Sequence, residues 1–204
     1  MGNQRLQRHI LLLLMFLVML IWSGYEPRDR LTWLLEVAPA LIGAIFMIIT
    51  YTRFPLTDMV YILVWFHAAI LLIGGHYTYA EMPLFNWLRD NFALERNYYD
   101  RLGHIFQGFV PAIVVREILL RLSPLRPGKW LFFLVTCVCL AISAFYELLE
   151  MGVAKLSGDA ATAFLATQGD IWDTQWDMFF ALLGALAALM LLSRWHDRQL
   201  SKLK

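Results

Sequence analysis

The stretch RLGHIFQGFVPAIVVREILL, residues 101–120, has the length and apolar character of a helix that crosses a lipid bilayer. Its first two turns are nevertheless polar, because they contain Arg101, His104 and Gln107, and Asp100 comes just before them. Ionisable groups inside a membrane usually face the interior of a helix bundle or a water-filled cavity. The stretch therefore predicts a membrane-spanning helix whose polar end is enclosed by other helices.

The composition of the whole chain agrees with a membrane protein. Of its 204 residues, 60% are hydrophobic and only 16% are charged, and the mean hydropathy is +0.58. A soluble domain is about 45–50% apolar and about 25% charged. We therefore predict an all-α, polytopic membrane helix bundle of about six transmembrane helices, forming one transmembrane domain over residues 1–204. The predicted spans are 10–24, 32–51, 59–80, 101–120, 130–150 and 176–193.

The first predicted span follows Arg5 and Arg8, as a signal peptide would. The residues after it, WSGYEP, offer no small-x-small cleavage site, so we expect an uncut anchor.

The distribution of basic residues predicts the orientation. If the N-terminus is cytoplasmic, eleven of the seventeen Lys and Arg residues lie on the cytoplasmic side. Cytoplasmic segments of membrane proteins are enriched in Lys and Arg, so both termini are predicted to be cytoplasmic. The basic residues form short clusters beside the spans, which membrane orientation alone explains, and no nucleic-acid partner is indicated.

With this orientation, polar side chains from four spans lie at one depth near the outer interface. Asp100 and His104 are four residues apart and share a helix face. Glu147 and Glu150 are three apart, and Asp173 and Asp177 accompany the start of the last span. If that helix begins at Asp170, its aspartates follow an i, i+3, i+7 stripe. We predict a polar pocket formed by His76, Asp100, His104, Gln107, Glu147, Glu150, Asp173 and Asp177.

Structural roles are alternatives for single members of this set. Asp100 and Asp177 lie where aspartate caps a helix start, and His104 would then bond to Asp100 or Glu147. Glu36, at the start of the second span, would pair with Arg28 or Arg30. His67 is nine residues before His76, which places the two on opposite helix faces, so His67 is predicted to pack or to bond between helices.

Two other segments bear on the architecture. Gly184 and Ala188, like Ala181 and Ala185, are small residues four apart, which permits close helix packing. The loop 81–99 contains PLFNWLRDNFAL, in which Leu84, Trp87 and Leu88 are spaced as on one helix side. We expect an interfacial helix there, either a lid over the pocket or an anchor.

Four motifs, HYTYAEMP, YYDRLGHIFQGF, YELLE and GDIWDTQWDM, resemble those of the YjdF family of bacterial inner-membrane proteins of unknown function. That resemblance covers most of the chain and implies a multi-pass protein of the bacterial cell inner membrane. The second half is also similar to VanZ-like membrane domains. Asp100, Arg101 and His104 match the first VanZ-like element, Glu147 the second, and Asp177 with Gly184 the third. Glu150 and Ala181 depart from that pattern, in which Gln and Asn are usual.

Two functions of different classes are compatible with the sequence. In the first, the pocket opens to the periplasm and binds or acts on an envelope lipid or a lipid-linked precursor. His104 would be the general acid/base and Asp100 would orient it, with Glu147 as a third catalytic candidate. A divalent metal would be held by His104, Glu147, Glu150 and Asp177. The substrate would contact His76, Gln107, Glu150, Asp173 and Asp177.

In the second, the protein is a non-catalytic small transporter or a structural membrane protein. The same carboxylates would then form a proton or cation relay, or a structural network. The absence of an H-E-x-x-H motif and of an obvious nucleophile leaves the enzyme assignment open.

Overall fold

Helices account for nearly all of the chain that the computed structural model describes, residues 3–157 and 162–203, and this part contains no strand. The elements are α1 (Asn3–Gly24), α2 (Arg30–Thr50), α3 (Asp58–Tyr77), the short 3-10 helix η1 (Tyr79–Glu81), α4 (Pro83–Phe92), α5 (Tyr99–Leu122), α6 (Lys129–Ser157), α7 (Thr162–Leu165) and α8 (Asp173–Leu200).

Local chemistry explains where several helices begin and end. The carboxylate of Asp29 accepts a hydrogen bond of 2.7 Å from the backbone N–H of Thr32 and caps the start of α2. The third predicted span overruns its helix, because Thr78 adopts a φ of 60° and α3 ends at Tyr77. Ala93, with a φ of 50°, ends α4 in the left-handed conformation.

Five helices, α1, α2, α3, α6 and α8, are long and apolar enough to cross a membrane. Together with the all-helical structure, they confirm the prediction of a polytopic helical membrane protein. The predicted span 101–120 lies within α5, which has 24 residues but is not one of these five. The orientation of the termini relative to the membrane stays a prediction.

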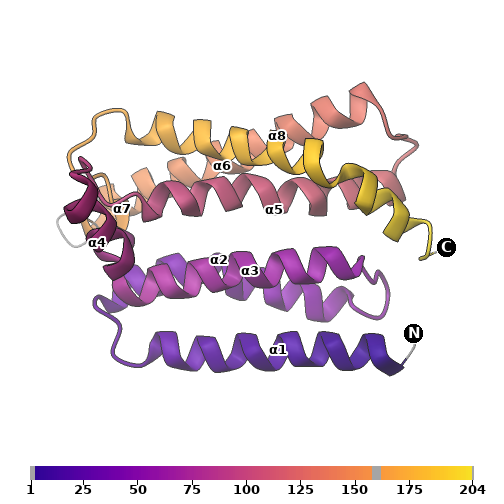
Figure 1. Ribbon diagram of the computed structural model, residues 1–204, viewed down its shortest axis with the longest axis horizontal. Helices are drawn as coiled ribbons and strands as arrows, with labels where there is room; N and C mark the ends of the chain where they lie inside the picture. Colours follow the sequence, from indigo (N-terminus) through magenta and orange to yellow (C-terminus); the bar gives the residue numbers. More distant parts are fainter. Residues whose placement is uncertain (1–2, 158–161, 204) are drawn as a thin grey trace.

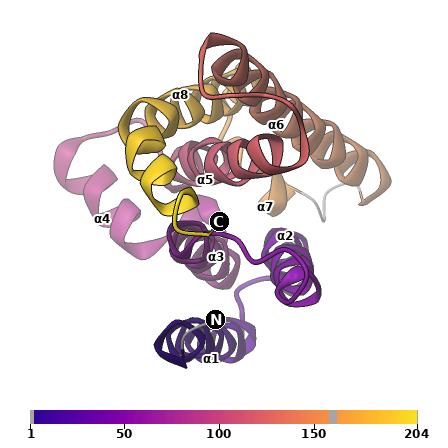
Figure 2. The same cartoon turned by 90° about the vertical axis from the view of Figure 1, so that its right-hand side faces the viewer.

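The long helices form two halves. α1 and α2 pack on α3, α5, α6 and α8 pack on one another, and α3 joins the halves by its contact with α5. Figure 1 shows both termini at one end of the bundle, with α4 and α7 at the other. Viewed along the bundle in Figure 2, α5 lies at the centre with α3, α6 and α8 around it. A polar cluster on α5 is therefore reached from three neighbouring helices.

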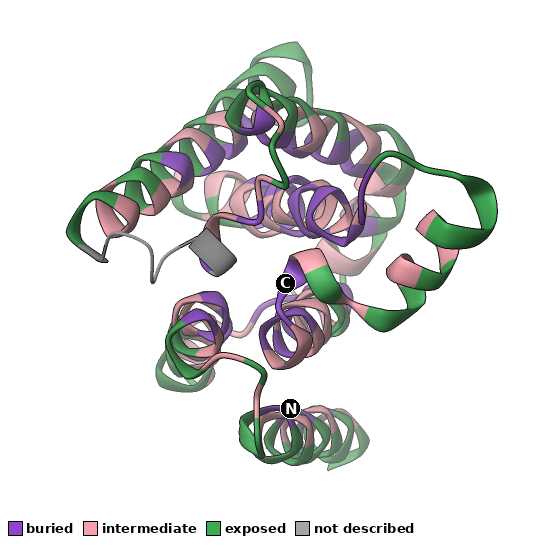
Figure 3. Cartoon of the chain, turned by 90° about the vertical axis from the view of Figure 1, so that its left-hand side faces the viewer, coloured by how far each residue is buried: buried purple, intermediate pink, exposed green. Residues whose placement is uncertain are grey.

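Glycines bring the backbones of α5 and α8 together. A Cβ atom added to Gly108 would lie 1.8 Å from the carbonyl oxygen of Ala181, and one added to Gly184 would lie 2.0 Å from that of Ile105. Ala181, Ala185 and Ala188 are fully buried, so the prediction of close packing from small residues is confirmed. Figure 3 shows the resulting pattern, with buried residues on the facing sides of these helices and exposed residues outside.

The predicted interfacial helix is α4, whose apolar side chains are exposed. Leu84 and Trp87 are each 56% exposed, which suits contact with lipid at the interface. None of its residues lines either of the two hollows described below.

A buried ionic network ties the helices at the end of the bundle that holds the termini. The carboxylate of Glu117 on α5 is fully buried and accepts hydrogen bonds from Thr57 and Arg121. It also lies 2.9 Å from Nε2 of His196 on α8, and Arg116 contacts the other nitrogen of that ring at 3.0 Å. Every oxygen of Glu117 thus has a partner, which indicates a structural role.

Candidate functional site

Arginine–aspartate pairs join the start of α5 to the start of α8. Oδ1 of Asp173 accepts hydrogen bonds of 2.6 Å from both Arg96 and Arg101. Arg101 also donates to Asp177, and its other nitrogen lies 3.2 Å from Asp170. α8 begins at Asp173 rather than Asp170, so the predicted three-aspartate stripe is not all helical, although all three contact Arg101.

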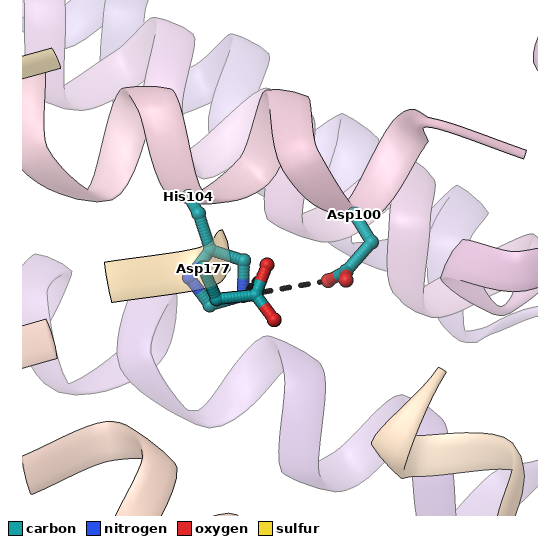
Figure 4. Close-up of side chains that lie close together, drawn as sticks. All are labelled: Asp100, His104 and Asp177. Carbon is teal, nitrogen blue, oxygen red and sulfur yellow. Dashed lines mark ion pairs between the residues drawn. The ribbon is translucent and has the colours of Figure 1, made fainter. Parts of the chain in front are cut away.

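His104 lies at the centre of the candidate site. Its Nε2 atom is 3.4 Å from Oδ1 of Asp100 and 3.4 Å from Oδ1 of Asp177 (Figure 4). Its Nδ1 atom is 2.9 Å from Oε1 of Gln107 and 3.9 Å from Oε1 of Glu147. Asp100, His104, Glu147 and Asp177 are all buried. One imidazole is therefore surrounded by oxygen atoms from two neighbouring helices and its own.

The loop before α5 is held in place by Asn97. Its side-chain oxygen accepts from the backbone N–H of Tyr99, and its amide nitrogen donates to the carbonyl of Met82. Its backbone forms two hydrogen bonds of 2.9 Å with the side-chain amide of Gln168. These contacts fix the loop that carries Arg96 against the segment that leads into α8.

A cavity of about 520 Å³ is lined by residues of α2, α3, α5 and α6. Its lining is polar at the end near η1, through Glu36, Tyr79, Asp100, His104, Gln107, Tyr146 and Glu150. The rest is largely apolar and continues along α2 and α5 to Thr50 and Ile118. The volume lies within the range of about 300–1,000 Å³ that is usual for small-molecule sites.

The mouth of the cavity lies on the side of the helix bundle. Three lining side chains are also exposed: Phe46 by 64%, Ile118 by 39% and Ile142 by 40%. They belong to α2, α5 and α6, so the opening lies between α2 and the second half of the bundle. A molecule would therefore enter from the side of the bundle.

Two prolines within helices line the same cavity. Pro39 on α2 and Pro111 on α5 lack an N–H group, so the carbonyl oxygens of Leu35 and Gln107 lose their usual partner in the helix. These carbonyls belong to the turns that carry Glu36 and His104. They add hydrogen-bond acceptors to the polar end.

A smaller hollow of about 410 Å³, termed the vestibule, lies where the end of α6 meets α7 and the start of α8. Glu147, Glu150, Lys155 and Asp173 are among its lining residues. Glu150 lines both the vestibule and the large cavity. The carboxylate cluster thus lies between a hollow at the bundle end and one that opens at the side of the bundle.

The structure brings most of the predicted residues together. Asp100, His104, Gln107, Glu147, Glu150, Asp173 and Asp177 lie in or directly beside the cluster, through the contacts and linings given above. His76 does not join them. Its Nδ1 atom lies 3.1 Å from the carbonyl oxygen of Ser23, and its ring packs on Trp22, so its neighbours are on α1.

Other members of the site were missed by sequence reasoning. Glu36 is 4% exposed and lines the cavity, and the expected pairing with Arg28 or Arg30 is wrong, since Arg28 contacts Glu81. His67 also lines the cavity. Tyr79 is buried there with its hydroxyl unpartnered among the described residues, and burial raises its pKa well above the ordinary value. The only sequence signal for Glu36 and His67 as site residues was their position as ionisable groups inside predicted membrane spans.

Comparison with known proteins agrees with this architecture. Residues 8–198 match the model of a family described as "Predicted membrane protein (DUF2238)". The chain is 51% identical to the inner membrane protein YjdF of Escherichia coli (strain K12) over 185 residues, which cover 91% of this chain and 88% of that protein. No solved structure matches. The resemblance to the YjdF family is thus confirmed, while the VanZ-like similarity stays a prediction. The chain belongs to this family of membrane proteins, and it is a multi-pass protein of the bacterial inner membrane.

Proposed function

We propose that the protein binds one amphipathic lipid of the cell envelope, or a lipid-linked precursor, in the large cavity. The observation that carries the proposal is the two-part lining, in which a cluster of ionisable groups ends an otherwise apolar hollow that opens sideways to lipid. A water-soluble ligand would not partition into the hydrocarbon and could not enter the cavity by this route. A lipid would place its chain on the apolar part and its head group at the cluster.

The length of the cavity suits a lipid chain. Its lining on α5 runs from Asp100 to Ile118, a rise of about 27 Å at about 1.5 Å per residue. The hydrocarbon core of a bilayer is about 30 Å thick. A lipid chain beside α5 would therefore stay within the hydrocarbon depth of the membrane.

The charges at the polar end favour a head group rich in hydrogen-bond donors, above all an amine. Glu36, Glu147 and Glu150 have no arginine or lysine partner among the described residues, whereas the nearby aspartates share Arg96 and Arg101. Oε1 of Glu147 is also buried without a hydrogen-bond partner in that part of the chain. Buried carboxyl groups without a cation partner accept hydrogen bonds from a donor-rich head group, and an ammonium group would stabilise their ionised form.

The proposal can be tested by the lipid that stays with the purified protein. A Cβ atom on Gly43, which lines the cavity, meets nothing within 4 Å, so Gly43→Phe would fill the cavity without displacing a helix. Gly152 on α6 is equally open but lines none of the hollows, and Gly152→Phe is the matched control.

We expect native mass spectrometry from nanodiscs of mixed phosphatidylethanolamine and phosphatidylglycerol to show the amine lipid bound to wild type and to Gly152→Phe. Gly43→Phe should lose it. Equal lipid retention by both variants, or a wild-type protein without lipid, would refute the proposal.

Chemistry on the bound head group is a second function, favoured by the vestibule. Water or a soluble co-substrate from the bundle end would meet the head group at Glu150, beside His104. His104 is the proposed general acid/base, because its ordinary pKa is nearest to neutral. Lipid analysis of cells that overproduce wild type or His104→Gln tests this function. A new lipid species that only the wild type makes would support catalysis. Identical lipid profiles would mean that the protein binds the lipid without modifying it.

A further inference from the structure

We infer that Asp100, His104 and Asp177 form a binding site for a divalent transition-metal ion, Zn²⁺ by their donor set. One ligand atom from each of the three lies within 4.8 Å of the others, and all three residues are buried. This inference concerns the cation alone and holds whether or not the cavity binds a lipid.

The spacing of the three atoms fits a metal better than a hydrogen bond. Nε2 of His104 is 3.4 Å from each carboxylate oxygen, and N–H···O bonds are usually about 2.7–3.2 Å long. Zn²⁺ binds histidine nitrogen and carboxylate oxygen at about 2.1 Å in tetrahedral geometry, which puts ligand atoms about 3.4 Å apart. The separations are thus close to the edges of a tetrahedral site.

The second nitrogen of the ring indicates that Nε2 carries the lone pair. Nδ1 is 2.9 Å from Oε1 of Gln107, a pure acceptor, so Nδ1 carries the proton and donates it there. In the neutral ring the Nε2 lone pair then faces two carboxylate oxygens, and a cation between them would be held by all three atoms. A metal-bound histidine usually donates its other N–H group to an oxygen in this way.

Acceptors also outnumber donors around this ring. Oε1 of Glu147 is buried and unpartnered among the described residues, and it lies 3.9 Å from Nδ1, beside Gln107. The single N–H of a neutral imidazole cannot satisfy Gln107, Glu147, Asp100 and Asp177 together. A divalent cation at Nε2 would compensate the two aspartates and leave Nδ1–H for the other side.

Neighbouring arginines leave room for the ion and orient its ligands. Asp100 turns Oδ2 toward Arg96 and Arg101, at 3.7 and 3.4 Å, and keeps Oδ1 for the His104 side. Asp177 is held in place by Arg101 through Oδ1, the oxygen that also faces His104, so the guanidinium and the ion would share this atom. Three protein ligands would leave the fourth position of a tetrahedral ion open, the arrangement of catalytic rather than structural zinc sites. Asp100 and His104 line the cavity, so that position would adjoin it.

The test is the metal content of detergent-purified protein from zinc-supplemented cells, measured by elemental analysis together with manganese and iron. We expect stoichiometric metal in wild type and in His76→Gln, whose histidine lies at the same bundle end but contacts α1. His104→Gln should lose it. Gln107→Leu keeps all three ligands and should weaken zinc affinity by about 10- to 100-fold.

Thermal unfolding with added Zn²⁺ gives a second measurement that does not depend on a damaged variant. Wild type stripped with a chelator should melt at a higher temperature when Zn²⁺ is returned, and His104→Gln should not respond. A metal-free wild type that ignores Zn²⁺, Mn²⁺ and Fe²⁺ would overturn the inference and favour a proton shared by His104 and the aspartates. Gly43→Phe should keep the metal even if it excludes lipid, which separates this inference from the proposed function.

Discussion

At the scale of single residues, Arg101 compensates more buried negative charge than any other side chain described at the end of the bundle opposite the termini. It contacts Asp173 and Asp177, both buried, as well as Asp100. Removing one partner of a buried ion pair costs about 3–5 kcal/mol, because the other charge stays buried and unpaired.

We therefore expect Arg101→Met to lower the free energy of unfolding by about that amount and to reduce the melting temperature in detergent. Arg89→Met is the control, because Arg89 pairs with its exposed neighbour Asp90, and such surface pairs contribute about 0–1 kcal/mol. Equal melting temperatures for the two variants would mean that the aspartates around Arg101 are protonated rather than ionised.

Asp29 makes a smaller contribution whose pH dependence has a definite sign. Hydrogen bonds from Thr32 lower the pKa of Asp29 below its ordinary value of 3.8. A carboxylate with a lowered pKa in the folded state stabilises the fold above the unfolded pKa and loses that effect as the pH falls through the folded value. Asp29→Ala should cost about 1 kcal/mol near neutral pH and less below about pH 4. Asp29→Asn keeps a capping oxygen, and its melting curves should show no such pH dependence.

The sequence predicts the members of the cluster that share a helix, but not those that folding brings in. Helical spacing predicts that Asp100, His104 and Gln107 belong to the cluster. Asp177 is predicted to join them because it lies at the same depth in the membrane. Glu36 and Tyr79 join only because α2 lies across the cavity from α5 and η1 packs on α5, and no local pattern contains that information. His76 has the right depth but faces α1, and depth alone does not fix the direction of a side chain.

At the scale of helices, the closest contact is that of α5 with α8. Gly108 and Gly184 permit it, since a Cβ atom on either would lie about 2 Å from a carbonyl oxygen of the other helix. The small-residue spacing on α8 predicts this packing, while its partner helix follows only from the structure. The helix ends are harder to predict, as at Thr78, whose positive φ is uncommon outside glycine.

Gly108→Ala should therefore push the two helices apart and cost at least about 1–3 kcal/mol, as overpacked cores do. Gly152→Ala adds the same methyl group to α6 where nothing lies within 4 Å, and alanine is a better helix former than glycine by about 1 kcal/mol. The two substitutions should thus shift the melting temperature in opposite directions. A stabilised Gly108→Ala protein would contradict the close approach.

At the scale of the whole molecule, six crossings and two cytoplasmic termini make a prediction about exposure. Asn91 near the end of α4 should face the periplasm, and Arg126 in the turn between α5 and α6 should face the cytoplasm. Both are exposed, and single cysteines there, with Cys137 and Cys139 replaced by serine, can be labelled in whole cells. A membrane-impermeant maleimide should label Asn91→Cys at once and Arg126→Cys only after the membrane is permeabilised. Immediate labelling at both positions would mean that α5 does not cross.

The ribosome completes α5 about fifty residues before it begins α8. The charged side chains of α5 nevertheless have their ion-pair partners on α8. Asp173 and Asp177 compensate Arg101, and His196 contacts both Arg116 and Glu117. Each charged residue at the centre of a lone helix costs about 2.5–3.5 kcal/mol during insertion by the translocon. We expect α5 to wait at the translocon until α8 arrives, and a nascent chain stopped after α6 to be recognised and degraded.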